Sequence, residues 1–281
     1  MKLQLVAAAQ GTAWVRKGFQ VFARQPLGFA SLFAACLFAF LLLGVIPFVG
    51  TLALLVLPPT GSLLFMIASR RVAGGETPMP GTLVEFARAG KPRVIALLKL
   101  GLAYAAATVL AFWIAGVLDG GAFESFMEAL ADDKRTSQSV ASHVADPRLQ
   151  LGLVLRLLFA GALSIPFWHA PALVYWGAQG WAKSLFFSSV ALWRNKGAFT
   201  VYGLVWMALW LMLLAIFSVA AVLLGPDRVK LLALPLSLVF LTVFYASVWF
   251  TFTDCFAPSD AVAAAPSADR DPPDSPPKGS S

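Results

Sequence analysis

The sequence predicts an all-α, polytopic membrane protein with six transmembrane helices, because of its composition and its long apolar segments. Hydrophobic residues make up 59% of the 281 residues, charged residues only 12%, and the mean hydropathy is +0.78. Charged residues usually form about a quarter of a soluble domain, so this composition excludes an ordinary soluble protein. A membrane-spanning helix needs ~20 mostly apolar residues. Six segments meet this requirement: 28–47, 49–69, 94–118, 151–176, 199–224 and 230–253.

The distribution of positive charge predicts how the chain is threaded. Fourteen of the 21 Lys and Arg residues lie in the N-terminal segment, the loops at 70–93 and 177–198, and the C-terminal tail. Five lie on the opposite side, in the loop at 119–149 and after the fifth span. Because loops rich in Lys and Arg stay in the cytoplasm, we expect a bacterial inner-membrane protein with both termini in the cytoplasm. We assign the net charge of +7 to this topology and not to nucleic-acid binding.

A basic and aromatic stretch precedes each odd-numbered span. Residues 14–24, 82–90 and 181–194 each place apolar side chains on one side of a helical wheel and basic side chains on the other. This pattern is typical of helices that lie in the membrane surface. The alternative explanation, that basic residues flank any cytoplasmic end of a span, accounts for the charges but not for the repeated aromatic face. We therefore interpret the chain as three repeats, each an interfacial helix followed by a helical hairpin.

These stretches supply the candidate lipid-surface contacts. We expect their aromatic rings to enter the acyl boundary and their cations to bind anionic phospholipid headgroups. Asp254, at the inner end of span six, is expected to pair with a basic residue of an interfacial helix. The nine candidates are Trp14, Arg16, Lys17, Arg24, Arg88, Lys91, Trp193, Arg194 and Lys196.

Prolines occur inside the even-numbered spans. Pro58 and Pro59 lie in span two, Pro166 and Pro171 in span four, and Pro235 in span six. A proline inside a helix removes a hydrogen bond, and neighbouring helices can bond the freed carbonyl within a membrane bundle. We expect each even-numbered span to be kinked, so that every hairpin has a straight outgoing helix and a kinked returning helix.

The segment 119–149 is the longest predicted loop between spans. It carries six acidic and three basic residues. After the Gly120-Gly121 pair, apolar residues recur on one helical face, which predicts a short amphipathic helix on the periplasmic surface. We expect this helix to pack against the outer ends of the bundle, and a docking site for a partner is the alternative.

Lys99, Arg156 and His169 lie within the predicted spans, where ionisable residues are functional candidates by default. Lys99 and Arg156 lie near span ends, so we expect them to act as interfacial anchors. His169 lies between Pro166 and Pro171 in a segment whose helix should be broken, and it is the candidate intramembrane polar site. Transporters place substrates at broken helices. We nevertheless favour a neutral histidine that bonds a freed backbone carbonyl, and a substrate site is the alternative.

No catalytic, cofactor or metal site is predicted. The sequence lacks the motifs G-x-x-x-x-G-K-[ST], H-E-x-x-H, G-x-S-x-G and C-x-x-C. His143 and His169 are too few for a histidine metal cluster within one chain. Asp132 and Asp133 lack the ligand spacing of a cation site.

The two ends of the chain are expected to differ in order. The first residues faintly resemble a signal peptide, but their apolar core is short and Arg16 and Lys17 follow, so we expect them to be retained. We assign residues 1–256 to the membrane domain. Residues 257–281 are rich in Ala, Pro, Ser and Asp and are expected to form a disordered cytoplasmic tail.

The stretch from Ser188 to Gly203, SSVALWRNKGAFTVYG, resembles a signature of an uncharacterised family of proteobacterial multi-pass inner-membrane proteins. It is also distantly similar to the membrane-anchor domain of some glycerophosphodiester phosphodiesterases, where a Ser-rich amphipathic helix and an Asn-containing turn precede a span. The resemblance covers residues 10–256 and implies a location and a fold. We do not expect the catalytic activity of those phosphodiesterases here.

Three functions fit this pattern. The preferred hypothesis is a non-enzymatic integral inner-membrane protein with a lipid-facing or scaffolding role in the envelope. Its partners would be the lipid bilayer and anionic headgroups, together with another membrane protein or a second copy of the chain, and it would need no cofactor. The alternatives are a transporter or channel that carries a small solute through the kinked helices, and an intramembrane enzyme of lipid metabolism.

Overall fold

The computed structural model describes residues 1–77, 90–131 and 142–257. Within these ranges the chain is almost entirely helical, and the two strands, β1 (Lys2–Leu3) and β2 (Phe256–Ala257), are two residues long. The predicted all-α class is confirmed. The predicted interfacial stretch at 82–90, Arg88 included, lies outside the described residues except for its last residue, as does the tail beyond residue 257.

Eleven helices lie in the described residues. They are α1 (Gln10–Arg24), α2 (Pro26–Gly44), α3 (Val49–Val56), α4 (Pro58–Ala73), α6 (Lys91–Asp119), α7 (Ala122–Ala131), α9 (Pro147–Phe167), α10 (Ala170–Tyr175), α11 (Trp181–Arg194), α12 (Lys196–Leu224) and α13 (Pro226–Cys255).

The long helices form three hairpins. The first consists of α2 with α3 and α4, the second of α6 with α9 and α10, and the third of α12 with α13. Five helices in the described residues are long and apolar enough to cross a membrane, or six if the bent pair α3–α4 counts as one span. The prediction of a polytopic helical membrane protein is therefore confirmed.

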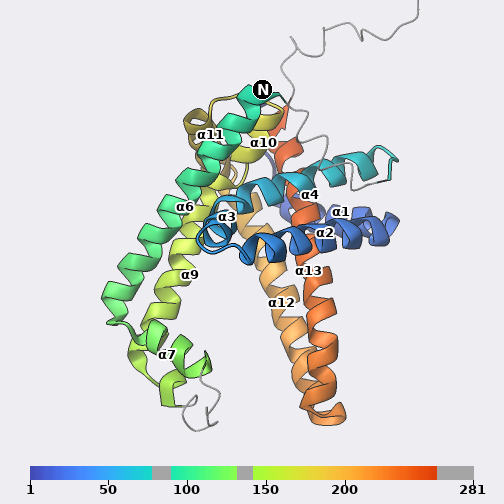
Figure 1. Ribbon diagram of the computed structural model, residues 1–281. Helices are drawn as coiled ribbons and strands as arrows, with labels where there is room; N and C mark the ends of the chain where they lie inside the picture. Colours follow the sequence, from blue (N-terminus) through green and yellow to red (C-terminus); the bar gives the residue numbers. More distant parts are fainter. Residues whose placement is uncertain (78–89, 132–141, 258–281) are drawn as a thin grey trace, which may run out of the picture.

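The second and third hairpins are close together at one end and spread apart towards the other (Figure 1). The tips of the second and third hairpins lie far apart, at the lower left and the bottom of the view. The tip of the first hairpin, formed by α3, lies beside the second hairpin, because α3 packs against α6. Much of each hairpin surface is consequently apolar and exposed, and α12 is the extreme case, with none of its most apolar stretch buried inside the protein.

The prolines of the even-numbered spans have different effects. Pro58 and Pro59 begin α4, and α3 and α4 meet at an angle of 52°. Span four is interrupted between Phe167 and Ala170. By contrast, α13 continues unbroken through Pro235. The expected kinks therefore take the form of helix breaks in spans two and four, and span six has no such break.

The two described helices that the sequence predicts to be interfacial, α1 and α11, pack against hairpins that they do not directly precede. Helix α1 leads into the first hairpin, yet it packs mainly against α12 and α13 of the third. Helix α11 leads into the third hairpin, yet it packs mainly against α9 and α10 of the second. The first and third units thus share the order of one short helix followed by a hairpin, and each packs that short helix against another unit.

The N-terminal segment also ends against the third hairpin. Strand β1 pairs antiparallel with β2, with Leu3 opposite Phe256. The backbone N–H of Gln4 donates to the carbonyl of Cys255 at 2.9 Å. The start of the chain and the end of α13 therefore form one packed unit.

Candidate functional site

A carboxylate at the end of α13 holds the first interfacial helix in place. The side chain of Asp254 accepts hydrogen bonds from Gln10 Nε2 at 2.5 Å and from Trp14 Nε1 at 2.9 Å. Lys17 Nζ lies 3.4 Å from the same oxygen and completes an ion pair. The expected pairing between Asp254 and a basic residue of an interfacial helix is confirmed.

Glycines allow α1 to pack closely on the third hairpin. A Cβ atom on Gly18 would lie only 2.6 Å from Cβ of Ser247, and one on Gly11 would collide with the carbonyl of Ala198. Between these glycines, the Trp14 ring packs against Phe199 with ring centroids 5.2 Å apart. The inner face of α1 is therefore fixed by shape as well as by hydrogen bonds.

This packing corrects the prediction for Trp14. The residue is 0% exposed and its indole N–H is bound to Asp254, so its ring cannot enter the acyl boundary. The helical wheel identified an apolar face correctly, but that face is covered by α12 and α13 instead of by lipid. Phe19, on the same helix, is exposed.

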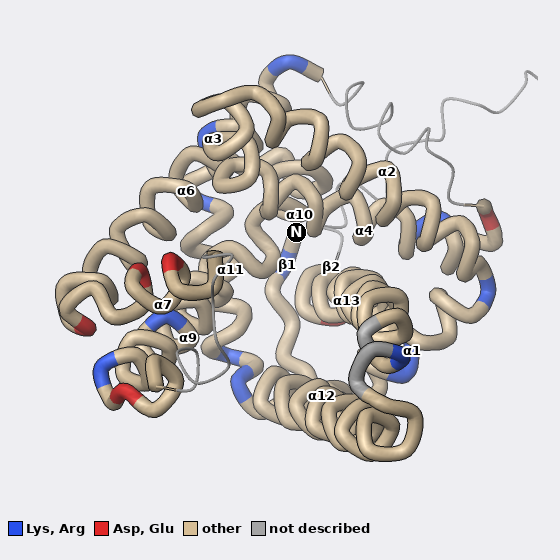
Figure 2. The backbone as a smooth tube through the Cα atoms, turned by 60° about the horizontal axis from the view of Figure 1, so that its bottom comes forward, with Lys and Arg blue, Asp and Glu red and all other residues tan. Residues whose placement is uncertain are grey.

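Most of the predicted cationic contacts lie on the molecular surface. Arg16 and Arg24 are exposed on α1, Lys91 is exposed at the start of α6, and Lys17 is partly exposed. At the junction of α11 and α12, Trp193, Arg194 and Lys196 are all exposed, and Lys196 Nζ lies 5.6 Å from the centre of the Trp193 ring. Figure 2 shows Lys and Arg spread over several elements, whereas Asp and Glu gather around α7 and the start of α9.

Asn195 fixes this second group of surface cations. It is 2% exposed, and its Oδ1 accepts from the backbone N–H of Val6 at 2.9 Å. Its Nδ2 donates to the carbonyl of Gln4 at 3.0 Å. Arg194 and Lys196 flank a buried residue that ties the N-terminal segment to the α11–α12 junction, so their positions are well defined.

A serine from α11 is inserted into the broken fourth span. The backbone N–H of His169 donates to Ser188 Oγ at 3.0 Å, and Ser188 Oγ donates to the carbonyl of Ile165 at 3.0 Å. In a continuous helix, the N–H of residue 169 would bond the carbonyl of residue 165 directly. An inserted side chain is a known cause of helix breaks, and here it also attaches α11 to the second hairpin.

His169 lies in a closed aromatic environment at this break. Its Nε2 is 3.0 Å from Thr251 Oγ1, which also accepts from Trp168 Nε1 at 3.1 Å. The Thr251 hydroxyl donates to the carbonyl of Val248, so it accepts from the imidazole, and this pattern assigns the proton to Nε2. Nδ1 has no hydrogen-bond partner among the described residues. The predicted bond from His169 to a freed carbonyl is wrong, because Ser188 makes that bond.

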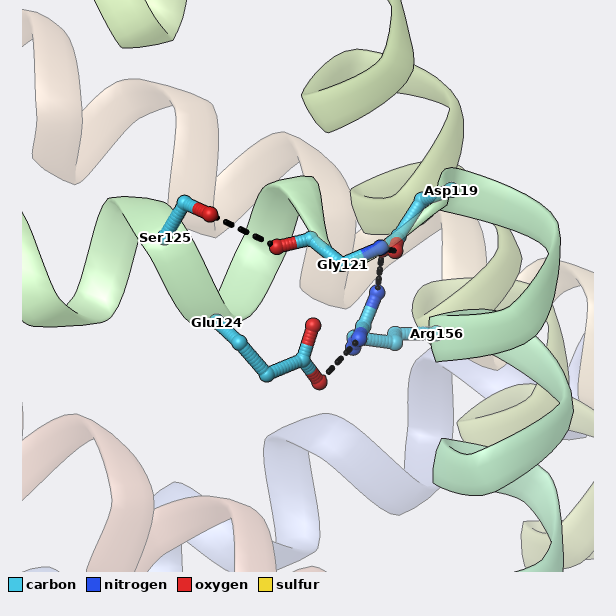
Figure 3. A network of polar contacts seen from close by, with 5 residues as sticks. All are labelled: Asp119, Gly121, Glu124, Ser125 and Arg156. Atoms are coloured by element: carbon cyan, nitrogen blue, oxygen red, sulfur yellow. Dashed lines mark hydrogen bonds and ion pairs between the residues drawn. The ribbon is translucent and has the colours of Figure 1, made fainter.

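A second buried polar group lies at the tip of the second hairpin (Figure 3). Arg156 Nη1 is 2.5 Å from Asp119 Oδ2, and Arg156 Nη2 is 3.3 Å from Glu124 Oε1. The guanidinium also lies 4.1 Å from the centre of the Phe123 ring. The Arg156 side chain is 7% exposed, so the expectation that it anchors at the interface is wrong. Lys99, in contrast, is exposed on α6.

The ion pair attaches the predicted loop helix to its own hairpin. Helix α7 occupies the position expected for the amphipathic helix, and it packs against α6 and α9. Glu124 and Phe123 supply its contacts to Arg156. Sequence reasoning missed Asp119, because it treated this residue as part of an acidic loop and not as the last residue of a helix.

The described residues contain no group of three or more His, Cys, Asp or Glu side chains that could hold a metal ion. The polar clusters instead connect helices to one another. The surface around them displays cations near the starts of the hairpins and apolar side chains along their lengths.

Comparison with known proteins identifies one relative and, through it, the family of this chain. No family model matches the chain. No solved structure matches it. A probable inner membrane protein of Burkholderia thailandensis is 34% identical over 260 residues, which cover 91% of this chain and 94% of the relative. These findings provide no link to glycerophosphodiester phosphodiesterases. The chain belongs to the same family as this probable inner membrane protein.

Proposed function

We propose that the protein is a non-enzymatic scaffold of the inner membrane that binds anionic phospholipid headgroups on the cytoplasmic side. In this proposal, the exposed cations of α1, of the α11–α12 junction and of the start of α6 form the headgroup-binding surface. The apolar hairpins extend from this surface into the bilayer.

The observation that carries the proposal is the way the interfacial helices are held. Asp254 and Trp14 fix the inner face of α1, while Arg16 and Arg24 are exposed on the same helix. Helix α11 is held by Ser188, and exposed cations follow at its end. Rigidly held cations lose less conformational freedom when they bind a headgroup than cations on a mobile segment would. Each Lys or Arg near an anionic membrane surface contributes ~1 kcal/mol to binding.

The test uses the full-length protein. We expect purified wild-type protein to retain phosphatidylglycerol through detergent washing, and the quadruple variant Arg16→Glu, Arg24→Glu, Arg194→Glu and Lys196→Glu to retain several-fold less. Lipid bound per protein, measured by mass spectrometry, is the readout.

The matched control is Arg148→Glu. This residue is exposed near the start of α9, on the predicted periplasmic side, so reversal of its charge should leave phosphatidylglycerol retention unchanged. Equal retention by the wild type and the quadruple variant would exclude headgroup binding by these cations.

A second candidate, transport of a small solute, is supported by the break at His169. The side chain is completely buried, and its Nδ1 has no hydrogen-bond partner among the described residues. Solute flux into vesicles that contain the protein, lost in His169→Ala or Pro171→Ala, would favour transport over the scaffold. The ring contacts of His169 with Phe199, Phe252 and Phe256 favour a packed and closed site instead.

A further inference from the structure

We propose that a groove between the first hairpin and α13 binds a lipid that has a long hydrocarbon chain and an uncharged, oxygen-bearing head. The groove consists of three neighbouring cavities of about 260, 280 and 220 Å³. The first and second cavities share Phe33 and Leu37, and the second and third share Pro58, Ser62 and Tyr245. We call this series of cavities the hairpin groove.

The first two cavities form the apolar part of the hairpin groove. On α2 their lining runs from Ala30 to Phe40, which corresponds to a rise of about 15 Å. On α13 it includes Leu238 and Leu241. Both helices are apolar enough to span a membrane, so hydrocarbon chains surround this part of the protein. The length and chemistry suit one acyl or isoprenoid chain.

Gly61 provides an independent sign of an open groove. This residue is partly buried in α4, yet a Cβ atom placed on it would meet no atom within 4 Å. It lines the second cavity, next to the 52° bend at the start of α4. A side chain added at this position would therefore start in open space within the groove.

The third cavity supplies polar contacts for a head. The hydroxyl-bearing residues Ser62, Tyr104 and Tyr245 line it, and their hydroxyls make no hydrogen bond within the described parts of the chain. Hydroxyl groups can donate to ester, carboxylic acid or alcohol oxygens. None of the residues described as lining the three cavities is charged. A charged headgroup would lack a counter-ion there, so the groove selects an uncharged head.

The experiment uses full-length protein in phosphatidylethanolamine vesicles that contain a diacylglycerol with a photoreactive diazirine in one acyl chain. We expect illumination to label peptides of α2, α4 and α13, and excess unlabelled diacylglycerol to compete with the label. Excess phosphatidylglycerol should not compete. In Gly61→Leu, labelling should fall about tenfold, because leucine occupies the space of several methylene groups in the groove.

Two further variants make the test specific. Gly203→Leu places the same side chain at an exposed site on α12, where a Cβ also meets no atom within 4 Å, and it should label like the wild type. The double variant Tyr104→Phe and Tyr245→Phe keeps the shape of the groove and removes two hydroxyls. In this variant, we expect excess diacylglycerol to reduce photolabelling less than it does in the wild type. A diazirine-bearing hydrocarbon that has no polar head should still label the variant as it labels the wild type.

The proposal is overturned if wild type, Gly61→Leu and Gly203→Leu are labelled equally, or if phosphatidylglycerol competes as well as diacylglycerol does. Either result would mean that the label reports ordinary surrounding lipid. The hairpin groove does not depend on the surface cations. If charge reversal leaves phosphatidylglycerol retention unchanged while Gly61→Leu still loses labelling, the headgroup-binding scaffold fails and the groove remains supported.

Discussion

Ser188 stands between two backbone groups that a continuous helix would join directly. Its hydroxyl accepts from the N–H of His169 and donates to the carbonyl of Ile165. Asp119 does for a charge what Ser188 does for hydrogen bonds. Its carboxylate pairs with the guanidinium of Arg156, which is almost completely buried. At the residue scale, the buried polar side chains thus supply a hydrogen-bond partner or an opposite charge to one particular buried group.

We expect Ser188→Ala to lower the free energy of unfolding by about 2–4 kcal/mol, because it leaves two buried backbone groups without a partner. Chemical unfolding in detergent micelles measures this loss. Ser189→Ala is the control, since Ser189 Oγ donates to the carbonyl of Leu185 within the same helix. Its loss should be within ~0.5 kcal/mol, and equal losses in the two variants would contradict the inserted-serine interpretation.

Arg156→Met should lower the free energy of unfolding by about 3–5 kcal/mol, because Asp119 would remain charged and buried. The double variant Asp119→Leu and Arg156→Met should recover most of that loss, since a well-packed apolar pair can replace a buried ion pair. Glu124 is 58% exposed, so water can solvate it in both variants. Losses that simply add in the double variant would show that the two side chains do not interact.

The polar residues were the part of the candidate site least predictable from the sequence. The pairing of Asp254 with α1 could be anticipated, because an acid at the end of a span faces nearby cations. The partners of Ser188 and Asp119 could not, since both contacts depend on how helices distant in sequence approach each other. Trp14 was misassigned because a helical wheel locates an apolar face but does not show whether lipid or protein covers it.

At the scale of elements, the docking of α1 depends on one carboxylate that receives three donors. We expect Asp254→Ala to leave the buried indole N–H of Trp14 without a partner and to loosen α1. Hydrogen exchange of the α1 amides should accelerate by at least about tenfold, as loss of ~1.4 kcal/mol implies.

Lys17→Ala is the corresponding control for the ion pair. The Lys17 side chain is 35% exposed and its nitrogen is 3.4 Å from the carboxylate, so the pair contributes only ~0–1 kcal/mol. Amide exchange in α1 should therefore change little. If Lys17→Ala loosens α1 as much as Asp254→Ala does, the ion pair and not the indole hydrogen bond is the main anchor.

Close helix contacts give a second prediction at this scale. A Cβ atom on Gly101 would collide with the carbonyl oxygen of Val56, where α3 packs against α6. Gly101→Leu should therefore lower the thermal unfolding midpoint by several degrees, since overpacking costs about 1–3 kcal/mol. Gly203→Leu should leave it unchanged, and an equal effect of both would exclude this contact as the cause.

Helix positions were largely predictable, and helix contacts were not. Long apolar runs determine where spans lie, so α6 and α12 begin and end within three residues of the predicted limits. Prolines indicated the breaks in spans two and four, but at Pro235 the continuous α13 shows that a proline alone does not fix a break. Helices that are apolar on all sides carry no sign of which face meets a neighbour.

At the scale of the whole molecule, the separation of the hairpin tips leaves extensive apolar surface. Within a bilayer this surface contacts hydrocarbon, so it carries no hydrophobic penalty. The same surface in water would aggregate. The architecture is therefore suited to a protein that shares a large boundary with lipid, with polar clusters at the contacts between elements.

The order in which the elements are synthesised gives a further prediction at this scale. A chain truncated before α13 lacks Asp254 and the part of the surface covering α1 that α13 provides. In membranes, we expect trypsin to cut such a chain at Arg16 or Lys17 much faster than it cuts the full-length protein. Equal cleavage rates would show that α1 is held without α13.

The contact between Trp14 and Asp254 joins residues that are 240 positions apart. Because ribosomes add ~5–20 residues per second, α1 exists for tens of seconds before its partner is made. During that interval its apolar face can contact α4 and α12 as they are made, but the part that α13 covers has only the membrane surface. The helix synthesised first thus reaches its final place last, and synthesis of α13 is the event that completes the fold.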